Sequence, residues 1–348
     1  MDVGCFAIKV TLLFLSFVVH HRGIARGGGC DLYEGKWVHD ESYPLYDTSQ
    51  CPFIEKEFDC LKNGRPDKDY LKYRWQPNAV KGKSIMFVGD SLSLNQWQSL
   101  TCMLHVALPH AKYSSVRTGG LSTFTFPAYG AKVMFSRNAF LVDIVSTNHG
   151  AALMLDSIEG GNLWKGIDVL VFNTWHWWLH RGRQQPWNFI QVGKATYRDM
   201  DRLVAYEKAL STWAKWVESN VDPAKTKVFF QGVSPDHMNG SDWREPNAKN
   251  CEGQKEPFFN KRGNYKYPAG PHPAQLVVEK VIGAMSKPVH LLDVTTLSQL
   301  RKDGHPSVYG HGGHRDLDCS HWCLAGVPDT WNQLLYAALL KSYLKPAS

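Results

Sequence analysis

The 348-residue sequence has no long charged tract, no low-complexity stretch and no internal repeat. The first two absences argue against intrinsic disorder, and 43% hydrophobic residues suffice for one large core or two smaller ones. No block of Lys and Arg is interleaved with aromatic residues, so we exclude nucleic acid as a partner. The net charge of +7 instead gives a mild preference for acidic partners, such as uronic-acid polymers or anionic surfaces.

Spacings typical of metal sites are missing as well. The nearest approach is the segment Cys319–Cys323, which contains His321 but lacks the second ligand pair of a zinc site. We therefore expect no metal.

The N-terminal apolar run is too short to cross a membrane comfortably. It covers Val10–Val19 after Lys9, whereas a spanning helix needs ~20 residues. The small residues in Gly23-Ile24-Ala25 suit a signal peptidase. We expect residues 1–25 to be a cleaved signal peptide, with a short uncleaved signal anchor as the alternative. Either one places the rest of the chain in the secretory lumen.

The chain contains eight cysteines. Outside the leader, seven remain: Cys30, Cys51, Cys60, Cys102, Cys251, Cys319 and Cys323. In an oxidising compartment these predict disulfides, and an odd number leaves one thiol free or joined to another chain. The sequon Asn239-Gly240-Ser241 predicts glycosylation of Asn239, which agrees with secretion.

The mature chain divides by pattern into two parts. Residues 26–80 are rich in Tyr, Pro, Asp and Cys, which predicts a disulfide-pinned cap that does not fold by itself. Residues 81–348 alternate strand-like runs with helical patterns, which predicts an α/β sandwich with a mainly parallel central sheet. The expected strands are 84–88, 132–135, 139–145, 168–173, 226–231 and 289–294, and the expected helices are 92–105, 199–220, 273–286 and 330–343.

One strand-to-helix turn is a candidate for chemistry. Residues 84–88 are typical of a buried strand, Gly89-Asp90 of a sharp turn, and Ser91 opens the helix. A serine there is lifted above the sheet edge beside unpaired helix N–H groups, which suits a nucleophile whose attack creates an oxyanion. The alternative is that Ser91 or Asp90 only caps the helix.

A second motif, near the C-terminus, offers a base. Asp318 and His321 are three residues apart, so a turn places both on one face and the carboxylate can hold one imidazole nitrogen. Disulfides at Cys319 and Cys323 would clamp this loop. The alternative is that His321 is a buried structural histidine.

A third motif, at 168–178, ends a buried strand at Asn173. Asn173 should emerge at the same sheet edge as Ser91, where its amide can donate to an oxyanion. The aromatic residues near these motifs are candidate walls of a substrate groove: Trp175, His176, Trp177, Trp178 and Trp322. The alternative for them is a hydrophobic lid over the core.

In this order the motifs resemble a known family. The sequence Gly89-Asp90-Ser91-Leu92, then Asn173, then Asp318-x-x-His321 is similar to the SGNH/GDSL hydrolase plan. Longer segments resemble the plant trichome birefringence-like family, from Cys30 to about Leu344: Phe58–Cys60, Asn63–Asp67, Tyr73–Trp75, Phe87–Leu92, Phe172–Trp178 and Asp318–Asn332.

The resemblance implies an SGNH/GDSL-like three-layer sandwich and O-acetylation of cell-wall polysaccharides such as xylan, mannan, xyloglucan or pectin. In the implied double displacement, Ser91 becomes acetylated, His321 is its general base and Asp318 orients His321. The N–H of Ser91 and the side chain of Asn173 would form part of the oxyanion hole. No bound cofactor is implied, and the acetyl donor would be acetyl-CoA or a carrier-derived acetyl group.

The family's disulfide pairing implies three bridges and one unpaired cysteine: Cys51–Cys102, Cys60–Cys323 and Cys251–Cys319, with Cys30 unpaired. Cys30 lacks a partner because the chain departs from the family pattern near residues 78–81, where a stretch with one cysteine is missing. Losing that bridge would cost ~2–5 kcal/mol of stability, and it affects stability and the placement of the cap more than the chemistry. A gene-model error is an alternative explanation for the missing stretch.

The acceptor of the acetyl group stays open at this point. Transfer to a sugar hydroxyl makes the protein a polysaccharide O-acetyltransferase, whereas transfer to water makes it a pectin or xylan acetylesterase. A non-catalytic wall-polysaccharide-binding protein is a third alternative, against which the complete set Ser91, Asp318 and His321 argues. The Golgi lumen or membrane is the favoured location, with membrane attachment through the N-terminal segment, and the apoplast is the alternative.

Overall fold

The computed structural model describes nine stretches of the chain: residues 37–41, 43–75, 84–107, 112–127, 130–181, 184–245, 247–258, 267–310 and 316–344. The expected leader, Cys30 and the junction near 78–81 lie outside the described residues. Among the helices of these stretches, none has the length and apolar character needed to cross a membrane.

A seven-stranded sheet with the order β13-β12-β9-β3-β6-β5-β4 forms the centre of the molecule. Its strands from β13 to β6 run parallel, and β5 and β4 are antiparallel to their neighbours. The prediction of a mainly parallel central sheet is therefore confirmed. The strands are β3 (Ile85–Gly89), β4 (Ser114–Thr118), β5 (Leu121–Phe126), β6 (Ala131–Arg137), β9 (Val169–Phe172), β12 (Lys227–Gln231) and β13 (Val289–Leu292).

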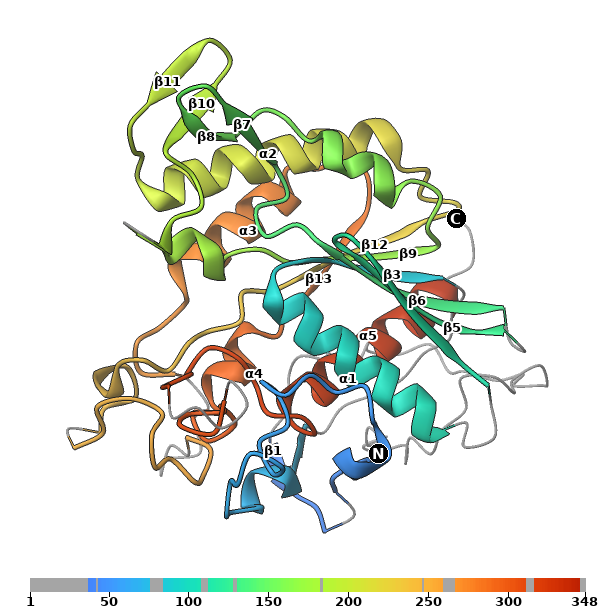
Figure 1. The fold of residues 1–348 in the computed structure, drawn as a ribbon, viewed down its shortest axis with the longest axis vertical. Coiled ribbons are helices and arrows are strands. Elements are labelled where there is room, and N and C mark those ends of the chain that lie inside the picture. The colour runs from blue at the N-terminus through green and yellow to red at the C-terminus, as the bar shows by residue number, and fades with distance from the viewer. Residues whose placement is uncertain are drawn as a thin grey trace, which may run out of the picture.

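Helices cover both faces of this sheet, as Figure 1 shows. One face carries α1 (Ser91–Ala107) and α5 (Val327–Leu344), and the other carries α2 (Arg202–Asn220) and α3 (Pro273–Gly283). A short helix, α4 (Thr295–Gln299), follows β13.

Each central strand contributes side chains to both layers. In β9, Val169 and Val171 belong to the core under α1 and α5, whereas Leu170 and Phe172 belong to the core under α2 and α3. All four are buried, as expected for a parallel sheet covered on both faces. The molecule is therefore a three-layer α/β sandwich.

Helix α2 shows how the sequence pattern produces one of these layers. The Asp201 carboxylate accepts hydrogen bonds from the N–H groups of Leu203 and Val204 at 3.0 and 3.1 Å, which starts the helix. Tyr206 and Trp213 lie on its buried face with no solvent exposure. The predicted helix at 199–220 is thus confirmed, apart from its first residues, which form the cap.

A smaller four-stranded sheet lies beyond α2, with the order β11-β10-β8-β7 (Figure 1). The predicted strand at 139–145 is wrong in its first half, because Phe140, Leu141 and Val142 lie in a buried turn. An apolar run predicts burial, and a turn with Leu141 at φ +60° buries these side chains equally well. The strands of the small sheet are β7 (Asp143–Thr147), β8 (Gly150–Met154), β10 (Phe189–Val192) and β11 (Ala195–Tyr197).

The N-terminal cap contacts the C-terminal part of the chain. Its strands β1 (Trp37–His39) and β2 (Tyr73–Trp75) form an antiparallel ribbon. Arg65, which is 6% exposed, donates from its guanidinium to the carbonyl oxygens of His305 and Asp303 at 2.9 and 2.8 Å. The cap therefore holds the segment that precedes the C-terminal motif.

Candidate active site

Ser91 stands at the carboxyl edge of the central sheet. Strand β3 ends at Gly89 and helix α1 begins at Ser91. The Asp90 carboxylate accepts from the N–H of Leu92 at 2.9 Å, so Asp90 caps the helix and the Ser91 hydroxyl is left for other contacts. As the first residue of α1, Ser91 also has an N–H without an intrahelical acceptor.

Ser91, His321 and Asp318 form one hydrogen-bonded chain. His321 Nε2 lies 2.6 Å from Ser91 Oγ, and His321 Nδ1 lies 2.7 Å from Asp318 Oδ2. An ionised carboxylate only accepts, so Nδ1 carries the hydrogen and Nε2 accepts from the serine hydroxyl. This is the arrangement in which an imidazole removes a proton from a nucleophile. The structure thus brings together all three residues that the motifs predict.

The electrostatics of the loop keep Asp318 charged. Burial acts to raise the pKa of Asp318, but hydrogen bonds and positive charge from His321 outweigh it, and the pKa lies well below its usual range. Its second oxygen accepts from the N–H groups of Ser320 and His321, each at 3.0 Å. Burial alone would lower the pKa of His321, but the bonded Asp318 carboxylate outweighs it and raises that pKa above 6.5.

Disulfides hold both ends of this loop. The structure contains the three bridges that the resemblance implies: Cys51–Cys102, Cys60–Cys323 and Cys251–Cys319. Cys319 and Cys323 flank His321 on either side in sequence. A backbone bridge adds to this, because Ser307 and Asp318 exchange N–H···O bonds of 2.8 and 2.9 Å. The loop is therefore fixed at several points around the imidazole.

Two buried histidines support His321 from behind, and sequence reasoning did not identify this role. His305 Nδ1 donates to the carbonyl oxygen of His321 at 2.7 Å, and its Nε2 lies 2.6 Å from His237 Nδ1. His237 Nε2 in turn lies 2.9 Å from Gln299 O. Burial lowers the pKa of His237 to about 4 and that of His305 well below its usual value. With both ring nitrogens engaged, His305 is not the base that acts on Ser91.

Asn173 follows β9 and reaches the same edge, as expected. Its Oδ1 accepts from Ser93 Oγ at 2.7 Å and from the N–H of Asp90 at 3.4 Å. These contacts orient the amide and leave Nδ2 as a donor. A Cβ at Gly89 would lie 2.1 Å from Asn173 Oδ1, so only glycine permits this close approach. Ser93 was not predicted, because only the fold shows what its side chain contacts.

Two of the predicted groove residues are in the core. Trp178 and Trp322 are fully buried, so their assignment to a groove wall is wrong. Trp178 Nε1 donates to Thr174 Oγ1 at 2.8 Å, and Trp322 Nε1 donates to Ser234 Oγ at 2.8 Å. Each indole thus satisfies its one donor inside the core, where its large apolar surface is removed from water.

Of the other three predicted groove residues, Trp175 is also buried in the core, so its assignment to a groove wall is wrong, and only His176 and Trp177 are partly exposed. Trp175 is 8% exposed and packs edge-on against Tyr206. His176 and Trp177 begin the short 3₁₀ helix His176–Leu179, and both are partly exposed. The ring of His176 lies 6.0 Å from that of His321, and burial lowers the pKa of His176. These two residues remain candidates for substrate contact.

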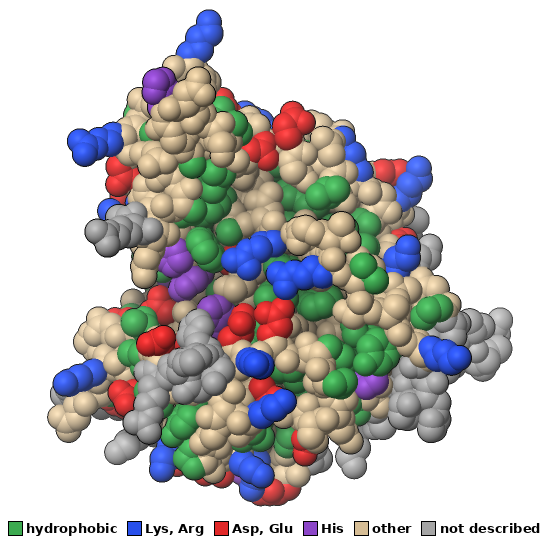
Figure 2. Space-filling model, in the orientation of Figure 1, with side chains coloured by type: hydrophobic (Ala, Val, Ile, Leu, Met, Phe, Trp, Pro, Cys, Tyr) green, Lys and Arg blue, Asp and Glu red, His purple; other side chains and the backbone are tan. Residues whose placement is uncertain are grey.

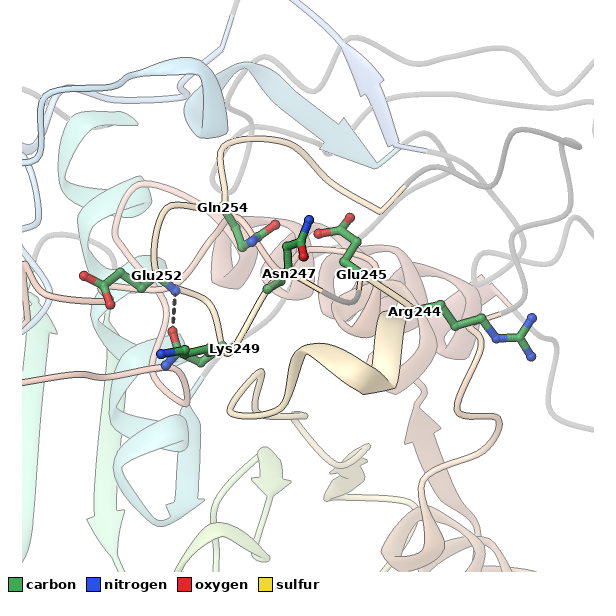
Figure 3. A pocket seen from close by; sticks show the side chains of 8 residues that line it. Arg244, Glu245, Asn247, Lys249, Glu252 and Gln254 are labelled. Atoms are coloured by element: carbon green, nitrogen blue, oxygen red, sulfur yellow. Dashed lines mark hydrogen bonds between the residues drawn. The ribbon is translucent and has the colours of Figure 1, made fainter.

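One cavity of the structure is separate from these residues. It measures about 570 Å³ and is lined by residues of the loop from Arg244 to Gln254, and Figure 3 shows the Arg244 side chain pointing away from the other labelled side chains. None of the three hydrogen-bonded residues lines it, so cavity size alone does not locate the chemistry. Within the described part of the chain, no group of three His, Cys, Asp or Glu side chains is placed to hold a metal ion.

Comparison with known families agrees with this geometry. Residues 78–338 match the PC-esterase model, a GDSL/SGNH-like acyl-esterase family found in Pmr5 and Cas1p, and residues 28–80 match the PMR5 N-terminal domain.

Relatives from Arabidopsis thaliana match over most of the chain. Protein trichome birefringence-like 43 is 59% identical over 330 residues, with 90% of this chain and 89% of the relative covered. Protein trichome birefringence-like 38 is 55% identical over 329 residues, with 90% and 85% covered. Protein trichome birefringence is 38% identical, with 89% of this chain but 56% of the relative covered. The chain therefore belongs to the trichome birefringence-like proteins of the PC-esterase family.

Proposed function

We propose that the protein is an O-acetyltransferase that acetylates hydroxyl groups of plant cell-wall polysaccharides. The observation that carries this proposal is the chain Ser91–His321–Asp318, with distances of 2.6 and 2.7 Å, in a member of an acyl-esterase family. Xylan, mannan and pectin are the candidate acceptors.

In the first half-reaction, Ser91 Oγ attacks the carbonyl carbon of the acetyl donor. His321 Nε2 takes the hydroxyl proton, and Asp318 stabilises the imidazolium that results. The tetrahedral intermediate carries its negative charge on the former carbonyl oxygen, where the N–H of Ser91 and Nδ2 of Asn173 donate. The donor's leaving group then departs with the proton from His321, which leaves acetyl-Ser91.

In the second half-reaction, the same imidazole removes the proton from a sugar hydroxyl. The sugar oxygen attacks acetyl-Ser91, and the returning proton restores the serine. Water in place of the sugar gives an acetylesterase, and the acyl-esterase description of the family supports this second candidate. Transfer requires that the bound sugar excludes water, and His176 and Trp177 are the partly exposed residues placed to contact it.

The proposal extends to the donor and the location. The donor is acetyl-CoA or a carrier-derived acetyl group, because the double displacement needs only an activated acetyl ester or thioester. Three disulfides and the exposed Asn239 of the sequon support a place in the secretory pathway. We assign the protein to the Golgi, attached through its N-terminal segment, with the apoplast as the alternative.

A product assay tests the proposal. The full chain is incubated with an acetyl donor and deacetylated oligomers of xylan, mannan and pectin, and mass spectrometry follows acetylated sugar and free acetate. Acetylated oligomer in this incubation indicates a transferase. A parallel incubation uses acetylated oligomers without a donor, and free acetate released there indicates the esterase. Ser91→Ala should abolish both products, whereas Ser115→Ala, on the exposed strand β4, should not. Full activity of the Ser91→Ala protein would contradict both enzyme assignments.

A further inference from the structure

Arg137 ends strand β6 next to the candidate nucleophile. In the parallel pairing of β3 and β6, Arg137 lies opposite Gly89, two residues before Ser91. The following residue, Asn138, donates its N–H to Gly89 O at 2.9 Å, so the chain beyond β6 stays beside the catalytic turn. Because the carboxyl ends of parallel strands meet at one edge, Arg137 is brought to the edge that carries Ser91.

A cavity of about 350 Å³ opens at this point. Residues of the segment 137–144 line it, together with Trp177 and Pro186. Trp177 follows Asn173 by four residues, so the cavity is lined from beyond the ends of β6 and β9, the two strands that flank β3 in the sheet. The Arg137 guanidinium carbon lies 5.7 Å from the centre of the Trp177 ring. The volume is at the lower end of small-ligand pockets, which suits a single sugar residue.

The positive charge of Arg137 has no close counter-charge within the described stretches. Asp143 also lines the cavity, but its carboxylate accepts hydrogen bonds of 2.5, 2.7 and 3.1 Å from residues 157–160. Burial raises the pKa of Glu55, and its carboxylate forms an ion pair with Arg117, at 3.8 Å. Figure 2 shows basic side chains at the centre of the face that it draws, beside histidine and acidic side chains.

We infer that the cavity between Arg137 and Trp177 is a carboxylate-binding subsite for a uronic acid residue of the acceptor polysaccharide. The guanidinium offers paired N–H donors that match a carboxylate, and the indole offers a flat apolar surface for a sugar ring. A neutral sugar has no negative charge to pair with the Arg137 guanidinium. The inference rests on the proposed function, because it assigns a substrate class, uronic-acid polysaccharide, to the same site.

A phosphate group of the acetyl donor has the same anionic chemistry as a uronate. The experiment therefore varies acceptor and donor separately. Its variants are Arg137→Gln, which removes the guanidinium, and Lys132→Gln, which removes the same charge from an exposed position near the other end of β6. Both are made in the full chain, and thermal unfolding checks that each variant folds.

The first arm measures binding by calorimetry in the Ser91→Ala background, where no turnover occurs. Arg137→Gln should weaken binding of a galacturonate oligomer about tenfold or more, since a hydrogen bond to a charged group contributes enough for that factor. Binding of a xylan oligomer of equal length should change less than twofold, and Lys132→Gln should change neither. Equal losses for the two variants, or for the two oligomers, would overturn the inference.

The second arm measures turnover with Ser91 in place. Arg137→Gln should raise KM for the galacturonate acceptor both with acetyl-CoA and with a phosphate-free acetyl ester. If Arg137→Gln raised KM only when acetyl-CoA is the donor, whether or not the acceptor carries a uronate, the anion site would belong to the donor. That result would overturn the inference. If the protein binds uronate through Arg137 but produces neither product, the proposed function fails and the subsite stands. If neutral and acidic oligomers are both acetylated and Arg137→Gln changes neither reaction, the proposed function stands and the uronate subsite fails.

Discussion

The orientation of the Asn173 amide provides a quantitative test of the proposed oxyanion hole. Ser93→Ala removes the 2.7 Å hydrogen bond to Asn173 Oδ1 and leaves the longer contact of 3.4 Å from Asp90. Such a bond between buried neutral groups contributes about 1 kcal/mol, so the rate of acetyl-enzyme formation should fall about fivefold. Asn173→Ala removes the donor itself and should lower that rate about 10²- to 10³-fold.

The double variant separates a positioning role of Ser93 from an independent one. If Ser93 acts only by holding the amide, Ser93→Ala has no further effect once Asn173 is alanine, and the coupling free energy equals the whole Ser93 effect, about 1 kcal/mol. Pre-steady-state release of a chromogenic alcohol from its acetyl ester measures the rate, with Ser115→Ala as the exposed control. A fivefold loss from Ser93→Ala in both backgrounds would refute the reasoning.

Three more perturbations follow from the geometry. Gly89→Ala would place a Cβ 2.1 Å from Asn173 Oδ1, so we expect a lower melting temperature and loss of turnover, measured by calorimetry and the product assay. The acid limb of the pH–rate profile should lie above pH 6.5, because His321 must be neutral to act as the base and its pKa is raised. Asp318→Asn should move this limb to lower pH and lower the plateau rate about 10³- to 10⁴-fold. Burial raises the pKa of Asp329 from 3.8 to about 6, so the folded state favours the protonated carboxyl. As pH rises from 4 to 7, the free energy of unfolding of the wild type, measured in urea, should fall by about 2–3 kcal/mol relative to that of Asp329→Asn. The same pH dependence of this free energy in both proteins would contradict the prediction.

The sequence predicted the central strands because each is an apolar run between turn residues. Strand β9, for example, is buried on both faces and carries no polar residue between Val169 and Phe172. Strand β4 escaped prediction for the opposite reason. Its five residues, Ser114–Thr118, are all exposed and mostly polar, so no hydrophobic pattern distinguishes them from a loop.

At the site, the predicted residues are those whose chemistry and spacing form a motif. Ser91, Asp318 and His321 belong to such motifs, and the structure joins them across 230 residues of sequence. The supporting contacts carry no local signal. His305 donates to a backbone carbonyl, which any loop possesses, and only the folded chain shows which carbonyl it is. For the same reason the sequence does not distinguish the buried Trp178 from the partly exposed Trp177 beside it.

The Cys60–Cys323 bridge also constrains how the protein is made. The two cysteines are 263 residues apart, so at 5–20 residues per second about 13–50 s separate their emergence during synthesis. Throughout that interval Cys60 can react with Cys51 or Cys102, which emerge close to it in time. If Cys60 has paired in this way, the native bridge requires thiol exchange after the C-terminal segment has arrived. The loop bearing His321 is thus completed last, once nearly the whole chain has entered an oxidising lumen.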